Sequence, residues 1–167
     1  DHPERRVAIK VARVGSPTGE RARRFELEAQ LLARLHHPGI AQIIEAGTTS
    51  AETGAMPFFV MEFVEGQSLT DYAAKHLGSA REKLQMMVRV CAPVAFAHAQ
   101  GVVHRDLKPD NVLIEASGAP RVLDFGVAKV EAAGGFGAAT LRTEAGRVIG
   151  TLGYMAPEQL SGTTEGI

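Results

Sequence analysis

The 167-residue sequence has little of several features that mark specialised classes of protein. Its single cysteine, Cys91, excludes an internal disulfide and favours a reducing compartment. The formal net charge of −1 leaves no dominant basic surface, which argues against nonspecific binding to nucleic acid. No apolar run is long enough to span a bilayer, and no charged-then-apolar signal peptide opens the chain. We therefore expect a cytoplasmic domain with no membrane segment in this stretch and no nucleic-acid partner.

What the sequence does have is the composition of an ordinary globular domain. Hydrophobic residues make up 45% and charged residues 22%, and the length is sufficient for one domain with a sizeable core. The chain begins with Asp1 rather than methionine, and a strand-like run already starts at Val7. We interpret it as a piece of a longer protein, whose remainder could carry a transmembrane segment.

The most informative stretch contains two short apolar runs, at 112–114 and 121–123. The residues between them include Ser, Gly and Pro, so the pattern predicts a β-hairpin. A hairpin returns the end of its second strand to the start of its first, which brings Asn111 close to Asp124. An amide oxygen and a carboxylate are suitable hard ligands for Mg²⁺.

A charged pair lies just before this hairpin. Asp106 is five residues before Asn111, in a segment where Pro109 breaks regular structure. Asp106 can therefore project into the same cleft as a base, with Lys108 beside it as a fixed positive charge. A polar loop next to an ordinary hairpin is the alternative, but it does not explain why these groups converge.

Residues 104–111 read His-Arg-Asp-Leu-Lys-Pro-Asp-Asn, and residues 124–126 read Asp-Phe-Gly. In this order and spacing they resemble the catalytic loop and magnesium motif of the eukaryotic-type protein kinases. A lysine two residues after the aspartate resembles the serine/threonine class. The stretch 147–159, which contains Ala-Pro-Glu, looks bacterial. The resemblance therefore implies a bacterial serine/threonine protein kinase.

The start of the chain contains two further elements of this resemblance. Residues 7–12 predict a strand whose Val-Ala-Ile-Lys resembles the kinase motif that directs Lys10 to the ATP phosphates; a surface lysine is the alternative. Residues 20–36 predict a helix with Glu28 on its apolar face. A carboxylate there needs a positive partner, and we favour Lys10 over a Glu28 that tilts into solvent. Glu26 is a weaker substitute.

The adenine site is assigned by resemblance alone. Residues 40–46 and 58–63 predict two more strands. Met61 would be the gatekeeper, and residues 62–64 would form the hinge. Backbone groups of Glu62 and Val64 would then bond the adenine edge. The alternative is an ordinary edge strand. The resemblance also assigns two further residues to the nucleotide site, Ala8 and Leu113.

A long helix is predicted over residues 80–100. Its apolar stripe includes Leu84, Met87, Val88 and Cys91, which we expect to be buried. Pro93 lies inside this helix, so we expect a kink.

The sequence after Gly126 has the composition of a flexible loop. Arg105 could pair with a phosphorylated residue of this loop and order it, and Thr140 and Thr143 are the candidates. Thr151 is expected to hydrogen-bond Asp106 and Lys108 instead.

The predicted fold is α+β, a two-lobed kinase-like fold incomplete at both ends. Residues 1–61 would form the N-lobe remnant, a small antiparallel sheet with one helix, and residues 62–64 the hinge. Residues 65–167 would form a mainly helical partial C-lobe with a β-hairpin, and the activation segment would cover 124–158.

The predicted function is transfer of the γ-phosphoryl group of ATP to serine or threonine hydroxyls of a protein substrate. Asp106 would orient or deprotonate the hydroxyl, Lys108 would stabilise the transferring group, and Asn111 and Asp124 would hold Mg²⁺. No glycine-rich loop precedes Lys10, so we expect this piece alone to be inactive.

Two other classes of protein remain as alternatives. A small-molecule phosphotransferase of the aminoglycoside-kinase type shares the Asp, Asn and Asp site, but Lys108 and the Ala-Pro-Glu at 156–158 argue against it. A noncatalytic pseudokinase would act as a binding module. The presence of every catalytic side chain argues against that reading.

Overall fold

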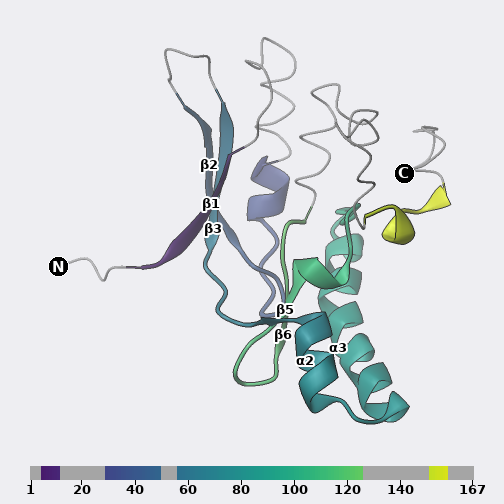
Figure 1. Cartoon of the computed structure of the whole chain (residues 1–167). Coiled ribbons are helices and arrows are strands. Elements are labelled where there is room, and N and C mark those ends of the chain that lie inside the picture. The colour runs from purple at the N-terminus through teal and green to yellow at the C-terminus, as the bar shows by residue number, and fades with distance from the viewer. Residues whose placement is uncertain (1–4, 12–28, 50–55, 126–150, 158–167) are drawn as a thin grey trace, which may run out of the picture.

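The computed structural model describes residues 5–11, 29–49, 56–125 and 151–157 (Figure 1). Within these ranges the chain forms two small antiparallel sheets, α-helices that follow the fourth strand, and short 3₁₀ helices. In chain order the elements are β1 (Val7–Val11), β2 (Ile43–Thr48), β3 (Pro57–Glu62), β4 (Gln67–Ser68), α2 (Leu69–His76), α3 (Ala80–Ala99), η1 (Pro109–Asn111), β5 (Val112–Ile114), β6 (Pro120–Val122) and η3 (Thr151–Tyr154). Residues 29–33 are also helical.

The first sheet has the strand order β1-β3-β2. Ala8 pairs with Met61, and Lys10 pairs with Phe59, so these four side chains lie on one face. That face is the inner one, because Phe59 and Met61 are buried. The outer face of β1 carries large apolar side chains that are exposed, with Ile9 64% accessible. Because side chains alternate between the two faces along β1, the side chain of Lys10 lies on the inner face of the sheet.

The second sheet contains the predicted hairpin. Its order is β4-β5-β6, and Leu113 pairs with Arg121. Gly118, with a φ of +79°, lies in the turn, where a side chain would be strained. The sequence prediction of strands at 112–114 and 121–123 is thus confirmed, with the second strand shifted by one residue.

The segment before β2 joins the two sheets. The amide of Val122 donates to the carbonyl of Gly39 (2.8 Å), and the amide of Ala41 donates to the carbonyl of Val122 (2.9 Å). Gly39 also lies against α3, since a Cβ at this position would be 3.0 Å from Cγ of Pro93. One continuous apolar core therefore extends from β3 through this segment to β5, β6 and α3.

Helix α3 corrects one sequence expectation, the choice of its buried face. Ser79 and Glu82 form a capping box at its start, and the helix continues through Pro93 to Ala99. Its buried residues are Met86, Val90, Pro93 and Ala97. The predicted stripe is wrong, because Leu84, Met87, Val88 and Cys91 are exposed. Both sets have helical spacing, and the position of β6 and of the Gly39 turn decides which face is covered. None of the described helices is long and apolar enough to cross a membrane.

Candidate active site

The loop before β5 gathers two predicted catalytic side chains, Asp106 and Lys108, and the predicted metal ligand Asn111. The side-chain amide nitrogen of Asn111, Nδ2, donates to the backbone carbonyl of Asp106 (2.7 Å) and to Oδ2 of the same residue (3.0 Å). The Nζ of Lys108 lies 3.0 Å from the same Oδ2. Pro109 begins the 3₁₀ turn η1, with Lys108 as its cap residue, and this turn folds Asn111 back onto Asp106. The carboxylate of Asp106 is thereby fixed, yet its side chain stays 28% accessible.

His104 holds the loop against the strand that leads to Asp124. Its Nε2 donates to the carbonyl of Leu123 (2.8 Å), because a carbonyl can only accept, and its Nδ1 accepts from the amide of Asp106 (3.3 Å). These two contacts require the neutral ring. Burial of the side chain also lowers the pKa of His104 below its ordinary value. Its ring packs against that of Phe125, with the two centroids 4.6 Å apart.

Two residues of the site have backbone conformations that L-amino acids rarely adopt. Arg105 has a φ of 65° and Asp124 a φ of 59°, and they are the only non-glycine residues with positive φ in the described part of the chain. Such conformations cost roughly 1–3 kcal/mol each and persist only where the surroundings enforce them. The strain is concentrated on the two segments that present Asp106 and Asp124.

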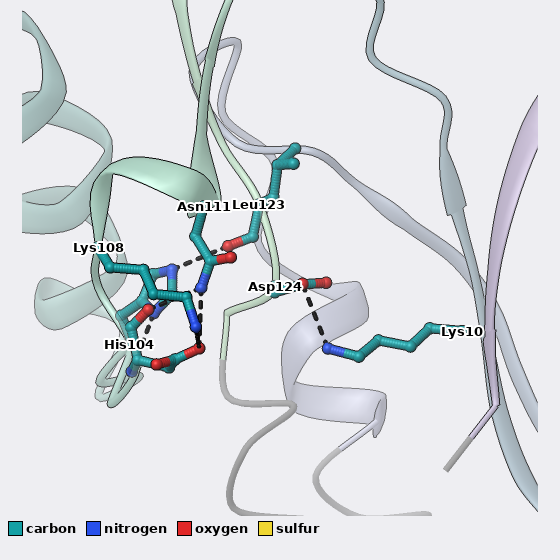
Figure 2. A network of polar contacts seen from close by, with 7 residues as sticks. Lys10, His104, Lys108, Asn111, Leu123 and Asp124 are labelled. Carbon is teal, nitrogen blue, oxygen red and sulfur yellow. Dashed lines mark hydrogen bonds and ion pairs between the residues drawn. The ribbon is translucent and has the colours of Figure 1, made fainter. Parts of the chain in front are cut away.

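The two sheets each provide one member of an ion pair. The Nζ of Lys10, on β1, lies 3.2 Å from Oδ2 of Asp124, directly after β6 (Figure 2). The side chains are 37% and 25% accessible, so the pair lies at the edge of solvent. Glu28, the predicted partner of Lys10, is outside the described residues. Its pairing therefore stays a prediction.

The predicted metal ligands flank two adjacent strands, with Asn111 just before β5 and Asp124 two residues after β6. The amide of Leu123 donates to the carbonyl of Asn111 (2.8 Å), which sets Asp124 beside Asn111. Since the side-chain nitrogen Nδ2 of Asn111 is directed to Asp106, the Oδ1 of Asn111 is the side-chain atom that remains for a cation. Among the described residues no group of three or more His, Cys, Asp or Glu side chains is placed to hold a metal. The donor set is one carboxylate and one amide oxygen, which suits a hard ion that keeps several waters, such as Mg²⁺.

The residues assigned to the adenine site fall on both sheets. Ala8 and Met61 are cross-strand neighbours on the inner face of the first sheet. Met61 also lines a small internal cavity together with Asp124 and Phe125. Glu62 ends β3, Val64 is half-buried two residues later, and Leu113 lies in the centre of β5. These residues therefore lie on the first sheet, just after its strand β3, and on the central strand of the second sheet.

Other residues named from the sequence lie outside the described part. Thr140 and Thr143 are in this group, and of Thr151 only the backbone, in η3, is described. Sequence reasoning missed Arg121, whose guanidinium contacts Glu62 and Glu115. No distinct signal in the sequence marks it, because an arginine between two apolar strand positions is also the pattern of a solvent-facing side chain.

Comparison with known proteins gives a consistent result. The family model described as protein kinase domain matches residues 1–166. The chain is 36% identical over 142 residues to the serine/threonine-protein kinase PknB of Mycobacterium leprae, covering 83% of this chain and 22% of that protein. It is 36% identical over 162 residues to the probable serine/threonine-protein kinase PknB of Lactococcus lactis, covering 96% of this chain and 24% of that protein.

A third relative is the serine/threonine-protein kinase PknA of Mycobacterium tuberculosis, with 40% identity over 162 residues, 95% of this chain and 36% of that protein. The chain spans about a fifth to a third of the length of these curated relatives. The family match extends over almost the whole sequence and includes both sheets and the loop that carries Asp106. The chain belongs to the protein kinase domain family.

Proposed function

We propose that this chain is the catalytic part of a bacterial serine/threonine protein kinase. In this reaction a hydroxyl oxygen of a protein substrate bonds to the γ-phosphorus of ATP. The bond from that phosphorus to the bridging oxygen of ADP breaks, and the hydroxyl loses its proton. The observation that carries the proposal is the cluster in which Lys108 and Asn111 both contact Oδ2 of Asp106.

The side chains have distinct roles in this proposal. Asp106 accepts the hydroxyl proton or orients the hydroxyl, since its carboxylate is fixed yet accessible. Lys108 carries a positive charge to the same point and stabilises the charge that develops on the transferring group. Lys10 lies opposite, next to Asp124, where it can hold the α- and β-phosphates.

A divalent cation fits the donor set of Asn111 and Asp124, and we infer that it is Mg²⁺. When bound, it would neutralise phosphate charge. Nucleotide would bind between the first sheet and the hairpin, with residues 62–64 as the hinge between an N-lobe part, 1–61, and a C-lobe part, 65–167. The acceptor on the protein substrate would be serine or threonine, because Lys108 follows Asp106 at the spacing of that class.

The test uses the full-length gene product with ATP, Mg²⁺ and a general protein acceptor. We expect phosphoserine or phosphothreonine by phosphoamino-acid analysis, and a loss of about 10²-fold or more in turnover for Asp106→Asn, within the range of general-base catalysis. Asp110→Asn is the matched control, since Asp110 lies on the same turn but is exposed. Mainly phosphotyrosine, or full activity of Asp106→Asn, would refute the proposal.

A further inference from the structure

Arg121 is a cation in the interior of the hairpin that the phosphoryl-transfer machinery does not use. It is the central residue of β6, and its neighbours Pro120 and Val122 are buried on the opposite face. The Arg121 side chain is only 13% accessible. A guanidinium in such a position is costly unless its donors are satisfied, so its contacts indicate what holds it there.

Those contacts link three segments that are far apart in sequence. Nη1 donates to Oε1 of Glu115 in the hairpin turn (3.2 Å). Nη2 donates to the carbonyl of Ile40, in the segment before β2 (3.3 Å), and to Oε2 of Glu62, at the end of β3. Arg121 therefore connects the second sheet to the first at the point where the chain passes from one to the other.

Glu62 is the residue on which this connection acts most directly. Its amide donates to the carbonyl of Gln42 (2.9 Å), and its carboxylate is held by Arg121. Glu62 is thus held both through its backbone amide and through its side chain, next to the carbonyl that follows. On the other strand of the hairpin, Leu113 is the cross-strand partner of Arg121, so both side chains lie on the same face. Arg121 therefore links Glu62 to the strand pair that carries Leu113.

We propose that Arg121 is a positioning residue for the adenine ring of the nucleotide. It fixes the backbone carbonyl of Glu62 relative to the side chain of Leu113. The carbonyl can then bond the edge of the adenine ring while Leu113 packs on its face. The inference rests on the proposed function, because it takes Glu62 and Leu113 as the adenine contacts. A guanidinium is suited to this role because its rigid planar fork presents donors from separate nitrogens to acceptors on different segments, whereas an ammonium group presents all three of its donors from a single nitrogen.

A purely structural ion pair would give a different pattern of effects. It would lower the thermal stability of the domain whichever partner is removed, and it would leave nucleotide affinity unchanged. A positioning role instead depends on which partner is removed. The Glu62 contact acts on the residue whose carbonyl is taken as the adenine acceptor, whereas the Glu115 contact acts on a residue of the hairpin turn that is not one of the adenine contacts. Glu115→Gln is therefore the matched control for Glu62→Gln.

The experiment compares Arg121→Met, Arg121→Lys, Glu62→Gln and Glu115→Gln in the full-length gene product. The measurements are the KM for ATP, kcat at saturating ATP, the Kd of adenosine, the Kd of inorganic triphosphate, and the thermal midpoint. We expect Arg121→Met and Glu62→Gln to raise the KM for ATP and the Kd of adenosine roughly tenfold, the effect of one misplaced hydrogen bond. The kcat and the Kd of triphosphate should change by less than about twofold, as expected for lost binding rather than lost chemistry.

Arg121→Lys should fall between wild type and Arg121→Met, and Glu115→Gln should leave adenosine binding near wild type. Combining Arg121→Met with Glu62→Gln should add little, because both remove the same contact. If Arg121→Met does not fold, Glu62→Gln and Arg121→Lys carry the same comparison. Unchanged adenosine binding in Glu62→Gln, or equal weakening in Glu115→Gln, would overturn the proposal. Absence of phosphotransfer in wild type would refute the proposed function separately, since adenosine binding is measured without turnover.

Discussion

Lys10 and Asp124 are 114 positions apart in sequence, and their charged groups lie 3.2 Å apart across the two sheets. The lysine is on the inner face of β1, and Asp124 follows β6 with a positive φ that aims its carboxylate at the lysine. The two charges therefore neutralise each other in this structure. Under the proposed function, ATP with its cation would supply one partner for each of them, and binding would exchange this pair for phosphate and metal contacts.

The first prediction concerns the metal. We expect Asp124→Asn to lower Mg·ATP-dependent turnover by about 10²-fold or more, because the variant loses the charge that would bridge cation and phosphate. Adenosine should still bind, since the adenine contacts lie elsewhere. Steady-state kinetics of the full-length gene product, with Asp110→Asn as control, measures this. Near-normal turnover by Asp124→Asn would rule out its assignment as a metal ligand.

The second prediction concerns pH and His104. Burial lowers its pKa in the folded protein, so around its ordinary value of about 6.5 the unfolded chain binds more protons than the folded one. The contribution of His104 to stability is therefore complete above that pH and is lost as the pH falls through the pKa of the folded state. We expect the free energy of unfolding to decrease between about pH 7.5 and pH 5.5.

Denaturant unfolding of His104→Gln should show a weaker dependence on pH than wild type. The matched control is His98→Gln, because His98 is exposed on α3 and should leave the dependence unchanged. Equal slopes for wild type and His104→Gln would contradict the neutral, buried histidine described above.

The third prediction concerns the two faces of α3. Val88 is 70% exposed and Leu84 67%, whereas Met86 is 4% exposed. We expect Leu84→Lys combined with Val88→Lys to reduce self-association of the 167-residue chain and to leave its helical content unchanged, since apolar patches promote association. Met86→Lys should unfold the chain, because a charge would be buried without a partner. Light scattering and circular dichroism measure both, and loss of helix in the double variant would show that the exposed face is covered.

The fourth prediction compares the 167-residue chain with the full-length gene product. Val7, Ile9 and Val11 are exposed on β1, an edge strand of the described sheet, and the apolar stripe of α3 is exposed as well. Open edges and apolar faces lower stability. We expect residues 1–167 alone to unfold with little cooperativity and to be essentially inactive. Cooperative melting together with phosphotransfer comparable to the full-length product would show that these faces need no cover.

The fifth prediction concerns regulation. Arg105 adjoins Asp106 and has a constrained backbone, so a phosphate that pairs with it would order the segment after Asp124. We expect autophosphorylation at Thr140 or Thr143 and an unmodified Thr151. Mass spectrometry of the active gene product tests this, with the Asp106→Asn variant as the unphosphorylated control. Modification at Thr151 alone would reverse these assignments.

The sequence by itself determined the hairpin and the tight turn that precedes it. Turn residues between two apolar runs restrict the chain locally, and Pro109 followed by Asn111 forces a tight turn, so these features need no distant partner. Motif order and spacing then indicated the family, which the comparisons confirmed.

The tertiary structure alone decided which face of α3 is buried, because two stripes with helical spacing compete and only the neighbouring strands select one. It also decided the partners of Arg121, since Glu62 and Ile40 are 59 and 81 positions away and no local pattern connects them. Contacts of this kind depend on how the two sheets pack. Local propensity acts over a few residues, whereas packing brings together side chains whose separation in sequence carries no information about their distance in space.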